Sequence, residues 1–414
     1  MVAPAYVQDS YVDHELSTNL DSTYAFEGPE KVLEVWLYEN ENQLSFIQSS
    51  EGLRCIPLEK WVRILDLVNC KILSMKSNSH MDAYLLSESS LFVFAHKVIL
   101  KTCGTTTTLA CLDQLFSTIN EYCFAPNDSS FNSKNCFRTL YSRRSFMFPD
   151  RQIHVHRDWK SETNLLNKFF ANGKSYIVGD SLSDDHWYLY QGGKDSSTKE
   201  VIPKMAHAQT FEVLMTELDP ECAAQFVTDR KPGMDDGTDE DHDLGHDMGL
   251  CTMQNSGLDS IFAPTNASSL GDSLYTADGK LLHDAFSFTP CGFSSNTMGE
   301  ELGGYYYTLH ITPENGWSYA SFETSYPFLA EKAAVGVVEV LVRILGIFKP
   351  GKFSLNFSTS DIDTDERVKR TYCALKSCDP VLNKLGYQKL ERVAYDMKHN
   401  CNLLYLNFKK RASE

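Results

Sequence analysis

The segment from Tyr84 to Val93 reads Tyr-Leu-Leu-Ser-Glu-Ser-Ser-Leu-Phe-Val, a strand-forming stretch interrupted by a run of polar residues. Hydroxyl groups inside an apolar strand pack poorly, so a reason other than stability is needed for them. By composition alone, Ser-Glu-Ser-Ser is typical of a surface loop. The chemical alternative is that Ser89 attacks the carbonyl of Glu88, which converts the peptide into an ester and finally leaves a new N-terminal carbonyl group. The strand-forming flanks favour this alternative.

The composition indicates a globular protein and argues against several partners. The chain has 414 residues, enough for one large core or two ordinary ones, and 42% of them are hydrophobic. Lys and Arg number 38 against 55 Asp and Glu, and the formal net charge of −17 argues against nucleic acid and anionic membranes as partners.

The twelve cysteines form no CxxC pair and no signal peptide precedes them, which predicts reduced thiols in the cytoplasm. The apolar run 333–348 contains Glu339 and Arg343 four residues apart, which indicates an amphipathic helix rather than a membrane span.

Charge and hydrophobic patterns divide the chain into five parts. We expect a flexible arm (1–25), a first block (26–227), an acidic and disordered insertion (228–280), a second block (281–408) and a short tail (409–414). Expected strands are 31–37, 98–102, 305–311, 318–322, 353–357 and 403–408, and expected helices are 107–122 and 333–347. Their close spacing favours antiparallel pairing. His242 and His246 lie among aspartates in the insertion, but no rigid element is expected to hold them, so no metal site is predicted.

Two further segments carry reactive side chains. Cys103 stands in Lys-Thr-Cys-Gly-Thr, and its plain interpretation is a buried core thiol. It also ends a strand and precedes a threonine-rich helix start, and a helix N-terminus lowers the pKa of a thiol. His310 lies on a strand whose same-face neighbours are Thr308 and Thr312, where a histidine is more often a satisfied core residue than a catalyst.

Together, these segments resemble the eukaryotic S-adenosylmethionine decarboxylases, which are pyruvoyl-dependent enzymes of polyamine synthesis. The resemblance extends from about Phe26 to Phe408 and includes the serine, cysteine and histidine segments in the expected order. It implies an α+β fold, a four-layer αββα sandwich of two facing antiparallel sheets with outer helices and pseudo-duplicated halves. The implied activity is decarboxylation of S-adenosylmethionine, which makes the aminopropyl donor for spermidine and spermine.

The resemblance also implies how the enzyme matures and works. Cleavage between Glu88 and Ser89 gives a β chain, 1–88, and an α chain whose first residue, the former Ser89, is a pyruvoyl group that forms a Schiff base with the substrate. No metal or diffusible cofactor is then required. Cys103 is implied to donate a proton to the substrate carbon. His310 is implied to take the α-proton of residue 89 during elimination and Ser294 to hydrogen-bond the ester, with Glu30 near the processing centre.

The substrate contacts are carried over from the same resemblance. Phe26 and Phe288 are implied to stack on adenine and face the sulfonium, which suits cation–π contact. Glu314 is implied to bind the ribose hydroxyls. The full set of implied substrate-binding residues is Phe26, Glu27, Leu86, Glu88, Phe288 and Glu314.

Four other polar residues lie in segments that are expected to form strands: Glu34, Thr210, Glu212 and Glu323. From the residues alone, the three carboxylates are unrelated and pair with lysines or arginines. The resemblance places all four in a buried acidic site that binds putrescine in several members of the family. Ala208 stands where the family has an aspartate and Leu140 where it has an aromatic residue. One lost carboxylate weakens the attraction for a diamine, so activation by putrescine stays open.

Two rival functions remain. A non-catalytic homologue that activates a partner subunit typically lacks the cleavable serine, which this chain retains. A serine hydrolase that uses Ser89 or Ser294 with His310 lacks support, because neither serine lies in a G-x-S-x-G elbow. The sequence leaves the oligomeric state open, including a homodimer of αβ units.

Overall fold

The structure, a computed structural model, describes residues 10–12, 28–41, 43, 51–87, 89–124, 131–146, 148–181, 186–194, 209–228, 244–264, 275–276, 279–314, 316–328, 333–360, 365–397 and 401–412. The chain divides into two compact units. The N-terminal unit comprises residues 1–13 and 29–198, and the C-terminal unit comprises residues 14–28 and 199–414.

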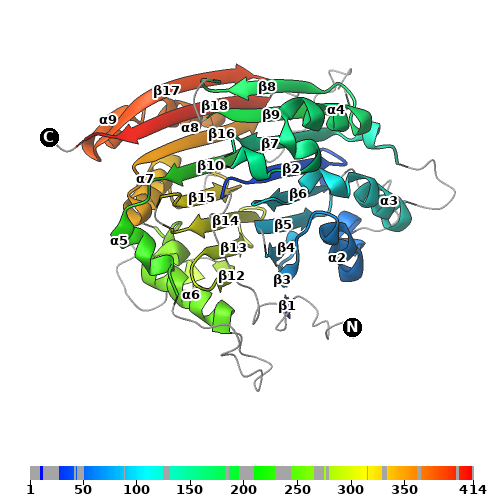
Figure 1. The fold of residues 1–414 in the computed structure, drawn as a ribbon, viewed down its shortest axis with the longest axis horizontal. Helices are drawn as coiled ribbons and strands as arrows, with labels where there is room; N and C mark the ends of the chain where they lie inside the picture. Colours follow the sequence, from blue (N-terminus) through cyan, green and yellow to red (C-terminus); the bar gives the residue numbers. More distant parts are fainter. Residues whose placement is uncertain are drawn as a thin grey trace. The chain divides into compact units, whose positions relative to one another are not determined.

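The N-terminal unit contains a nine-stranded antiparallel sheet in the order β1-β3-β4-β5-β6-β2-β7-β9-β8 (Figure 1). Its strands are β1 (Ser10–Val12), β2 (Lys31–Trp36), β3 (Ile72–Ser77), β4 (Met81–Leu86), β5 (Ser89–Phe94), β6 (Lys97–Thr102), β7 (Arg138–Arg144), β8 (Lys174–Val178) and β9 (Trp187–Gly192). β3 to β6 form a meander of short connections, and β6 pairs with β2. The predicted strands at 31–37 and 98–102 and their antiparallel pairing are confirmed.

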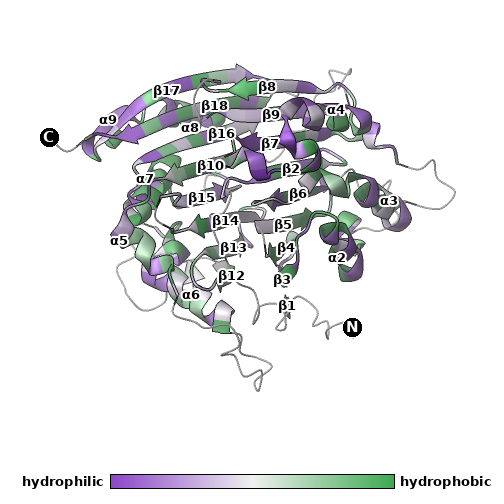
Figure 2. Ribbon diagram, in the orientation of Figure 1, coloured by the Kyte–Doolittle hydropathy of each residue, from purple (hydrophilic) through white to green (hydrophobic). Residues whose placement is uncertain are grey.

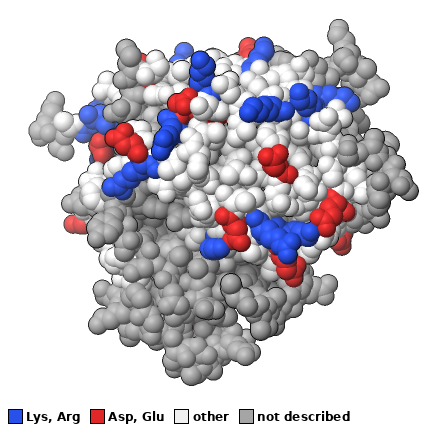
Figure 3. Space-filling model, turned by 45° about the vertical axis from the view of Figure 1, so that its right-hand side comes forward, with Lys and Arg blue, Asp and Glu red and all other residues white. Residues whose placement is uncertain are grey.

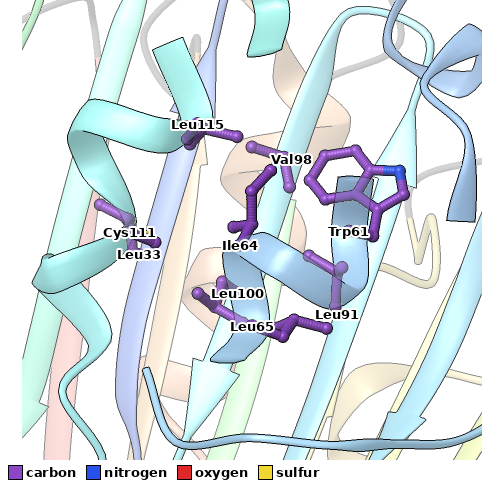
Figure 4. Close-up of a pocket in the computed structure, with 9 residues that line it drawn as sticks. All are labelled: Leu33, Trp61, Ile64, Leu65, Leu91, Val98, Leu100, Cys111 and Leu115. Carbon is purple, nitrogen blue, oxygen red and sulfur yellow. The ribbon is translucent and has the colours of Figure 1, made fainter. Parts of the chain in front are cut away.

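Helices cover one face of this sheet: α2 (Leu58–Asp66), α3 (Leu112–Cys123) and α4 (Trp159–Phe169). α2 buries Trp61, Ile64 and Leu65, which lie three and four residues apart and therefore share one side of the helix. Figure 2 shows the resulting mixture of hydrophobic and hydrophilic residues on these helices. Apolar side chains of α2, α3, the turn before α3 and the sheet line a small cavity of about 10 Å³, room for at most one water molecule (Figure 4). Its lining consists of Leu33, Trp61, Ile64, Leu65, Leu91, Val98, Leu100, Cys111 and Leu115.

The C-terminal unit contains a second nine-stranded antiparallel sheet, in the order β11-β12-β13-β14-β15-β10-β16-β18-β17. Its strands are β10 (Gln209–Thr216), β11 (Tyr275–Thr276), β12 (Gly279–Ser287), β13 (Phe293–Gly299), β14 (Tyr305–Thr312), β15 (Tyr319–Thr324), β16 (Lys352–Ser360), β17 (Tyr387–Asp396) and β18 (Cys401–Lys410). Its helices are α5 (Pro220–Ala223), α6 (Leu244–Ser256), α7 (Val337–Phe348), α8 (Glu366–Lys376) and α9 (Asp379–Lys384).

The two units repeat one connectivity. In each, a first strand (β2 or β10) takes a central position, a four-stranded meander returns to pair with it, and the remaining three strands add on its other side. β3-β4-β5-β6 thus correspond to β12-β13-β14-β15, and β7-β9-β8 correspond to β16-β18-β17. The repeated order supports the expected duplication, although the sequences show no visible repeat.

The repeat also explains where two expectations fail. β10 was expected in the first block, but it pairs with β15 and β16 in the second sheet. The sheet that a strand joins depends on non-local pairing, which the order of the chain does not reveal. In addition, residues 10–12 of the expected flexible arm form β1, which pairs with β3. The rest of the first 25 residues lie outside the described part of the chain.

The expectation of disorder across 228–280 is wrong for residues 244–264. α6 lies there, between β10 and β12, in the place that α2 takes between β2 and β3. Its buried residues Gly245, Gly249 and Met253 are spaced by four, and the two glycines let the helix backbone approach β12 closely. Arg343 of α7 donates hydrogen bonds to the carbonyls of Ile261 and Ala263 (2.6 and 2.7 Å), and it also forms the predicted ion pair with Glu339 (2.7 Å). The expectation also fails at 275–276 and 279–280, where β11 pairs with the start of β12. The other residues of the predicted insertion, 229–243, 265–274 and 277–278, lie outside the described part of the chain and include His242.

The two faces of the second sheet differ in chemistry. One face carries Phe211, Val213, Phe322 and Leu355 into the core formed with α7, α8 and α9. The other face carries a row of polar residues that lie opposite one another on successive strands: Asp284, Asn296, Thr308, Glu323, Glu212 and Asn356. At least five members of this row are buried, which is unusual for polar groups unless they form bonds with one another or bind something.

Acidic and basic residues are mixed on at least one face of the molecule, despite the net negative charge. On the face drawn in Figure 3, most of the described acidic residues lie close to lysines or arginines, and one stands alone in a wide uncharged area. The N-terminal unit contains the ion pairs Lys60–Glu121 (2.9 Å) and Arg54–Asp82 (3.0 Å).

Candidate active site

Several of the predicted site residues of the N-terminal unit meet at one end of four neighbouring strands. Ser89 begins β5 and lies opposite Leu86 of β4 and Thr102 of β6. Cys103 directly follows Thr102, and Glu30 directly precedes β2, whose first residue lies opposite Thr102. Adjacent strands are about 4.8 Å apart, so the register alone brings these residues close together. All of them are buried.

Ser89 has an unusual conformation. Its φ angle is +119°, in a region that residues with a Cβ rarely adopt and that costs on the order of 1–3 kcal/mol. Its side chain is 1% exposed, and its Oγ has no hydrogen-bond partner among the described residues. Glu88 lies outside the described residues. A strained backbone and an unsatisfied buried hydroxyl both oppose stability, which agrees with the expectation that this serine has a chemical role.

Ser87, by contrast, has a structural role. Its Oγ accepts a hydrogen bond from the backbone N–H of Lys71 (3.0 Å), and its own N–H donates to the carbonyl of Lys71 (2.8 Å). Ser87 therefore fixes the turn that precedes Ser89.

Cys103 lies in a turn and not at a helix N-terminus. Gly104, with φ +61°, turns the chain after β6, and the first helical turn, η3 (Thr108–Cys111), begins five residues after Cys103. Cys103 therefore does not lie at the helix N-terminus that was expected to act on its thiol. The turn is held instead by side chains: Lys31 Nζ and Gln152 Nε2 both donate to the Gly104 carbonyl (3.0 and 3.2 Å), and Thr106 Oγ1 donates to the Cys103 carbonyl (2.5 Å).

A buried polar network supports the far side of this turn. The backbone N–H of Leu109 donates to His156 Nε2 (3.4 Å), so the other ring nitrogen, Nδ1, carries the hydrogen and donates to Glu162 (2.7 Å). Tyr141 and Arg143 of β7 also donate to Glu162, both at 2.7 Å. Burial lowers the pKa of His156, and the bond to Glu162 opposes this effect. Burial, followed by the charge of Glu162, raises the pKa of Tyr141 well above its usual range.

The predicted pair in the C-terminal unit forms a direct contact. Ser294 of β13 lies opposite His310 of β14, and Ser294 Oγ and His310 Nδ1 are 2.9 Å apart. His310 Nε2 is 3.0 Å from Thr308 Oγ1, which in turn donates to Asn296 Oδ1 (3.0 Å). Asn296 was not among the predicted site residues, although its place two residues after Ser294 on a strand would have indicated the same face.

Phe288 and Glu314 lie near the corresponding end of these strands. Phe288 follows β12 and packs edge-on against Phe286 (centroids 4.9 Å apart), and its N–H donates to the carbonyl of Gly292 (2.9 Å). Gly292 has φ +114°, which favours glycine, and returns the chain towards Ser294. Glu314 lies two residues after β14 and is partly exposed. Phe26 and Glu27 lie outside the described residues.

The predicted acidic residues fall into two groups. Glu212 of β10 and Glu323 of β15 lie directly opposite each other and are buried, and Glu323 accepts a hydrogen bond from Tyr306 (2.7 Å). Thr210 lies two residues before Glu212 on the same strand. Glu34, in the N-terminal unit, accepts from the Trp36 indole and lies 4.0 Å from Arg138, as expected for a paired carboxylate. Ala208 lies outside the described residues.

Comparison with known proteins identifies the family. A family model described as adenosylmethionine decarboxylase matches residues 23–409. The chain belongs to the adenosylmethionine decarboxylase family. The S-adenosylmethionine decarboxylase proenzyme of Saccharomyces cerevisiae is 43% identical over 407 residues, which cover 97% of each chain. The proenzyme of Xenopus laevis is 31% identical over 389 residues, covering 94% of this chain and 96% of that protein.

A solved structure supports the fold. The crystal structure of the Trypanosoma brucei AdoMetDC-delta26 monomer matches with a TM-score of 0.51 and 21% identity, covering 78% of this chain and 99% of that chain. The expected family, its decarboxylase class and the α+β fold of two antiparallel sheets with helices are thus confirmed. The described residues contain no helix long and apolar enough to cross a membrane. Within the same residues, no group of three or more His, Cys, Asp or Glu side chains could hold a metal ion.

Proposed function

We propose that the chain cuts itself between Glu88 and Ser89 and then decarboxylates S-adenosylmethionine. The observation that carries the proposal is Ser89, which combines a φ of +119° with a buried, unsatisfied Oγ. Attack of this Oγ on the preceding carbonyl forms the C–O bond of an ester while the peptide C–N bond breaks, and the hydroxyl proton passes to the freed amine of residue 89. Family membership supports the same step, because the curated relatives are named proenzymes.

Residue 89 then becomes the pyruvoyl group, with chain 1–88 as the β chain and the rest as the α chain. The position fits such a group, because it lies at the buried end of β5, next to Leu86 and Thr102. A pyruvoyl carbonyl supplies an electron sink for loss of carbon dioxide. Cys103 is proposed to protonate the substrate carbon, and its turn is fixed for that purpose by the hydrogen bonds to Gly104 from Lys31 and Gln152.

Ser294 and His310 are proposed to serve the self-cleavage, with Glu30 near the same centre. The 2.9 Å contact between Ser294 Oγ and His310 Nδ1 supports this role, because it links a hydroxyl that can bond the ester to an imidazole that can take a proton. His310 then removes the α-proton of residue 89, and elimination releases Glu88 as a carboxylate. Hydrolysis of the resulting dehydroalanine releases ammonia.

The proposed substrate contacts follow the family resemblance. Phe288 and Phe26 stack on adenine, Glu314 accepts from the ribose hydroxyls, and Glu27 and the main chain at Leu86 and Glu88 complete the pocket. The edge-on packing of Phe286 supports Phe288 in this role, because it leaves the ring orientation fixed by a buried neighbour.

The buried carboxylates Glu212 and Glu323 are proposed to form an acidic site for a cationic regulator such as putrescine, together with Thr210 and Glu34. Two carboxylates at opposed positions of neighbouring strands repel each other, and a cation bound between them would remove that repulsion. We also propose that the enzyme is cytoplasmic, because all twelve cysteines are free thiols.

The processed enzyme can also form a homodimer of αβ units. Such a dimer would be seen as a doubled mass in light scattering.

Mass spectrometry of the purified wild-type chain and of Ser89→Ala tests the proposal. The wild-type chain should give two fragments that meet at residue 88, with a blocked N-terminus on the larger one, and should release carbon dioxide from carboxyl-labelled S-adenosylmethionine. Ser89→Ala should remain intact and inactive. One intact, inactive wild-type chain would contradict the proposal and favour the non-catalytic activating homologue.

A further inference from the structure

Four polar side chains on β13 and β14 form a block that extends beyond the Ser294–His310 pair. Ser294 lies opposite His310 and Asn296 lies opposite Thr308. Alternate residues of a strand share a face, so the four side chains lie together. None of them is more than 6% exposed, and therefore their hydrogen bonds are made chiefly to protein groups rather than to bulk water.

The direction of each hydrogen bond in the block follows from the number of protons available. Thr308 Oγ1 donates its single hydrogen to Asn296 Oδ1 at 3.0 Å. Towards His310 Nε2, also at 3.0 Å, Thr308 Oγ1 can then only accept, so Nε2 carries a hydrogen. In a neutral imidazole the other nitrogen, Nδ1, therefore holds the lone pair and accepts from Ser294 Oγ at 2.9 Å.

We infer that Asn296 and Thr308 are positioning residues that hold His310 in its Nε2–H tautomer and make Nδ1 the base of the self-cleavage reaction. This inference rests on the proposed function. In the ester, the Ser294 hydroxyl turns from Nδ1 to the ester oxygen, which frees the Nδ1 lone pair. Nδ1 then takes the proton from Cα of residue 89, and the electrons of the Cα–H bond form the Cα=Cβ bond. The Cβ–Oγ bond breaks, and Oγ leaves with Glu88 as its carboxylate. His310 becomes an imidazolium whose Nε2–H still donates to Thr308.

The neighbours of His310 show why the hydrogen bonds of Thr308 and Asn296 matter for its tautomer. Its cross-strand neighbours are Ser294 and Ser321, both neutral, whereas Glu323 lies opposite Thr308. Histidines that act as bases are often oriented by a carboxylate bonded to the ring. At both cross-strand positions beside His310, a neutral serine stands instead, and the hydroxyl of Thr308, fixed by an amide oxygen, sets the tautomer.

The tautomer can be measured without any cleavage. Histidine labelled with ¹⁵N in the Ser89→Ala precursor gives long-range ¹H–¹⁵N spectra in which protonated and unprotonated ring nitrogens differ, and His310→Gln identifies the signals of His310. We expect Nε2 of His310 to be protonated and Nδ1 unprotonated. Thr308→Val should abolish this preference, whereas Thr308→Ser and Asn296→Asp, which keep the hydroxyl and the acceptor oxygen, should preserve it. A protonated Nδ1 in the precursor would overturn the inference, even if Thr308→Val failed to fold.

Rates of self-cleavage test whether the tautomer of His310 matters for the reaction. In the chain that retains Ser89, Thr308→Val should slow cleavage at least about tenfold, because a positioned base contributes on the order of 10²–10⁴-fold. Thr308→Ser should restore most of the rate. Cleavage of Thr308→Val at the wild-type rate would refute the positioning role. If the wild-type chain never cleaved while His310 kept its Nε2–H tautomer, the proposed function would fail and the assigned tautomer would stand.

Discussion

Replacing Gly249 by alanine should loosen α6 from β12, whereas the same replacement at Gly346 in α7 should stabilise its helix. Both glycines lie inside helices, where alanine is favoured over glycine by about 1 kcal/mol. A Cβ at Gly346 would meet nothing within 4 Å. A Cβ at Gly249 would lie 2.6 Å from the carbonyl carbon and oxygen of Ala285 and from the nitrogen of Phe286, all backbone atoms that cannot rotate away.

The magnitude follows from these distances. Carbon atoms prefer separations of about 3.5–4.0 Å, so α6 must withdraw by roughly 1 Å, a gap that removes about a quarter to a half of the contact energy along the interface. Overpacking of this kind costs about 1–3 kcal/mol. After the gain in helix propensity, we expect Gly249→Ala to lose on the order of 1–2 kcal/mol, and Gly346→Ala to gain up to about 1 kcal/mol.

Hydrogen exchange measured by mass spectrometry is the suitable assay, because it reports the opening of each helix separately. Using the Ser89→Ala background avoids mixtures of cut and uncut chains. A loss of about 1.4 kcal/mol corresponds to about tenfold faster exchange, which should appear in peptides of α6 and β12 for Gly249→Ala only. If α6 exchanged as slowly in Gly249→Ala as in the parent, or more slowly, the close approach of α6 to β12 would be refuted.

Two further predictions concern the turn that contains Cys103 and the buried network of His156 beside it. Cys103→Ala should still cleave itself but should release carbon dioxide at least about a hundredfold more slowly, measured with carboxyl-labelled substrate; unchanged turnover would exclude Cys103 as the acid. Because burial lowers the pKa of His156, the unfolded chain binds this proton first as pH falls, so the contribution of His156 to stability should be constant above about pH 6.5 and decline below it. His156→Gln should reduce that decline by at most about 1.4 kcal/mol per pH unit in urea unfolding of the Ser89→Ala chain, and an unchanged pH dependence would show that His156 does not contribute.

Local patterns in the sequence were sufficient for several strands and helices, whereas the roles of the reactive residues came from the family resemblance and stay predictions. The alternating residues of β14 and the amphipathic run of α7 predict their elements directly, because each pattern depends on neighbours a few residues away. α6 was missed because it packs through glycines and lacks a continuous apolar stripe. The threonines after Cys103 indicated a helix start too early, because Gly104 inserts a turn before η3.

The parts of the site that could not be predicted depend on pairing between distant segments. The bond between Gln152 and the Gly104 carbonyl joins residues 48 positions apart. The opposition of Glu212 and Glu323 depends on β10 entering the second sheet, which no local pattern indicates. The proposed roles of these residues stay predictions, and the experiments above test Ser89, Cys103 and Thr308 directly.

The backbone at Ser89 has a consequence for the order of events in the life of the chain. A positive φ is unfavourable because an L-residue has a tetrahedral, chiral Cα with a Cβ attached. If residue 89 becomes a pyruvoyl group, its Cα is a flat, achiral carbonyl carbon with no preceding peptide, and the φ angle no longer exists. The precursor would then fold around a stereocentre that its mature form lacks, so the scaffold would match the finished enzyme better than the translated one.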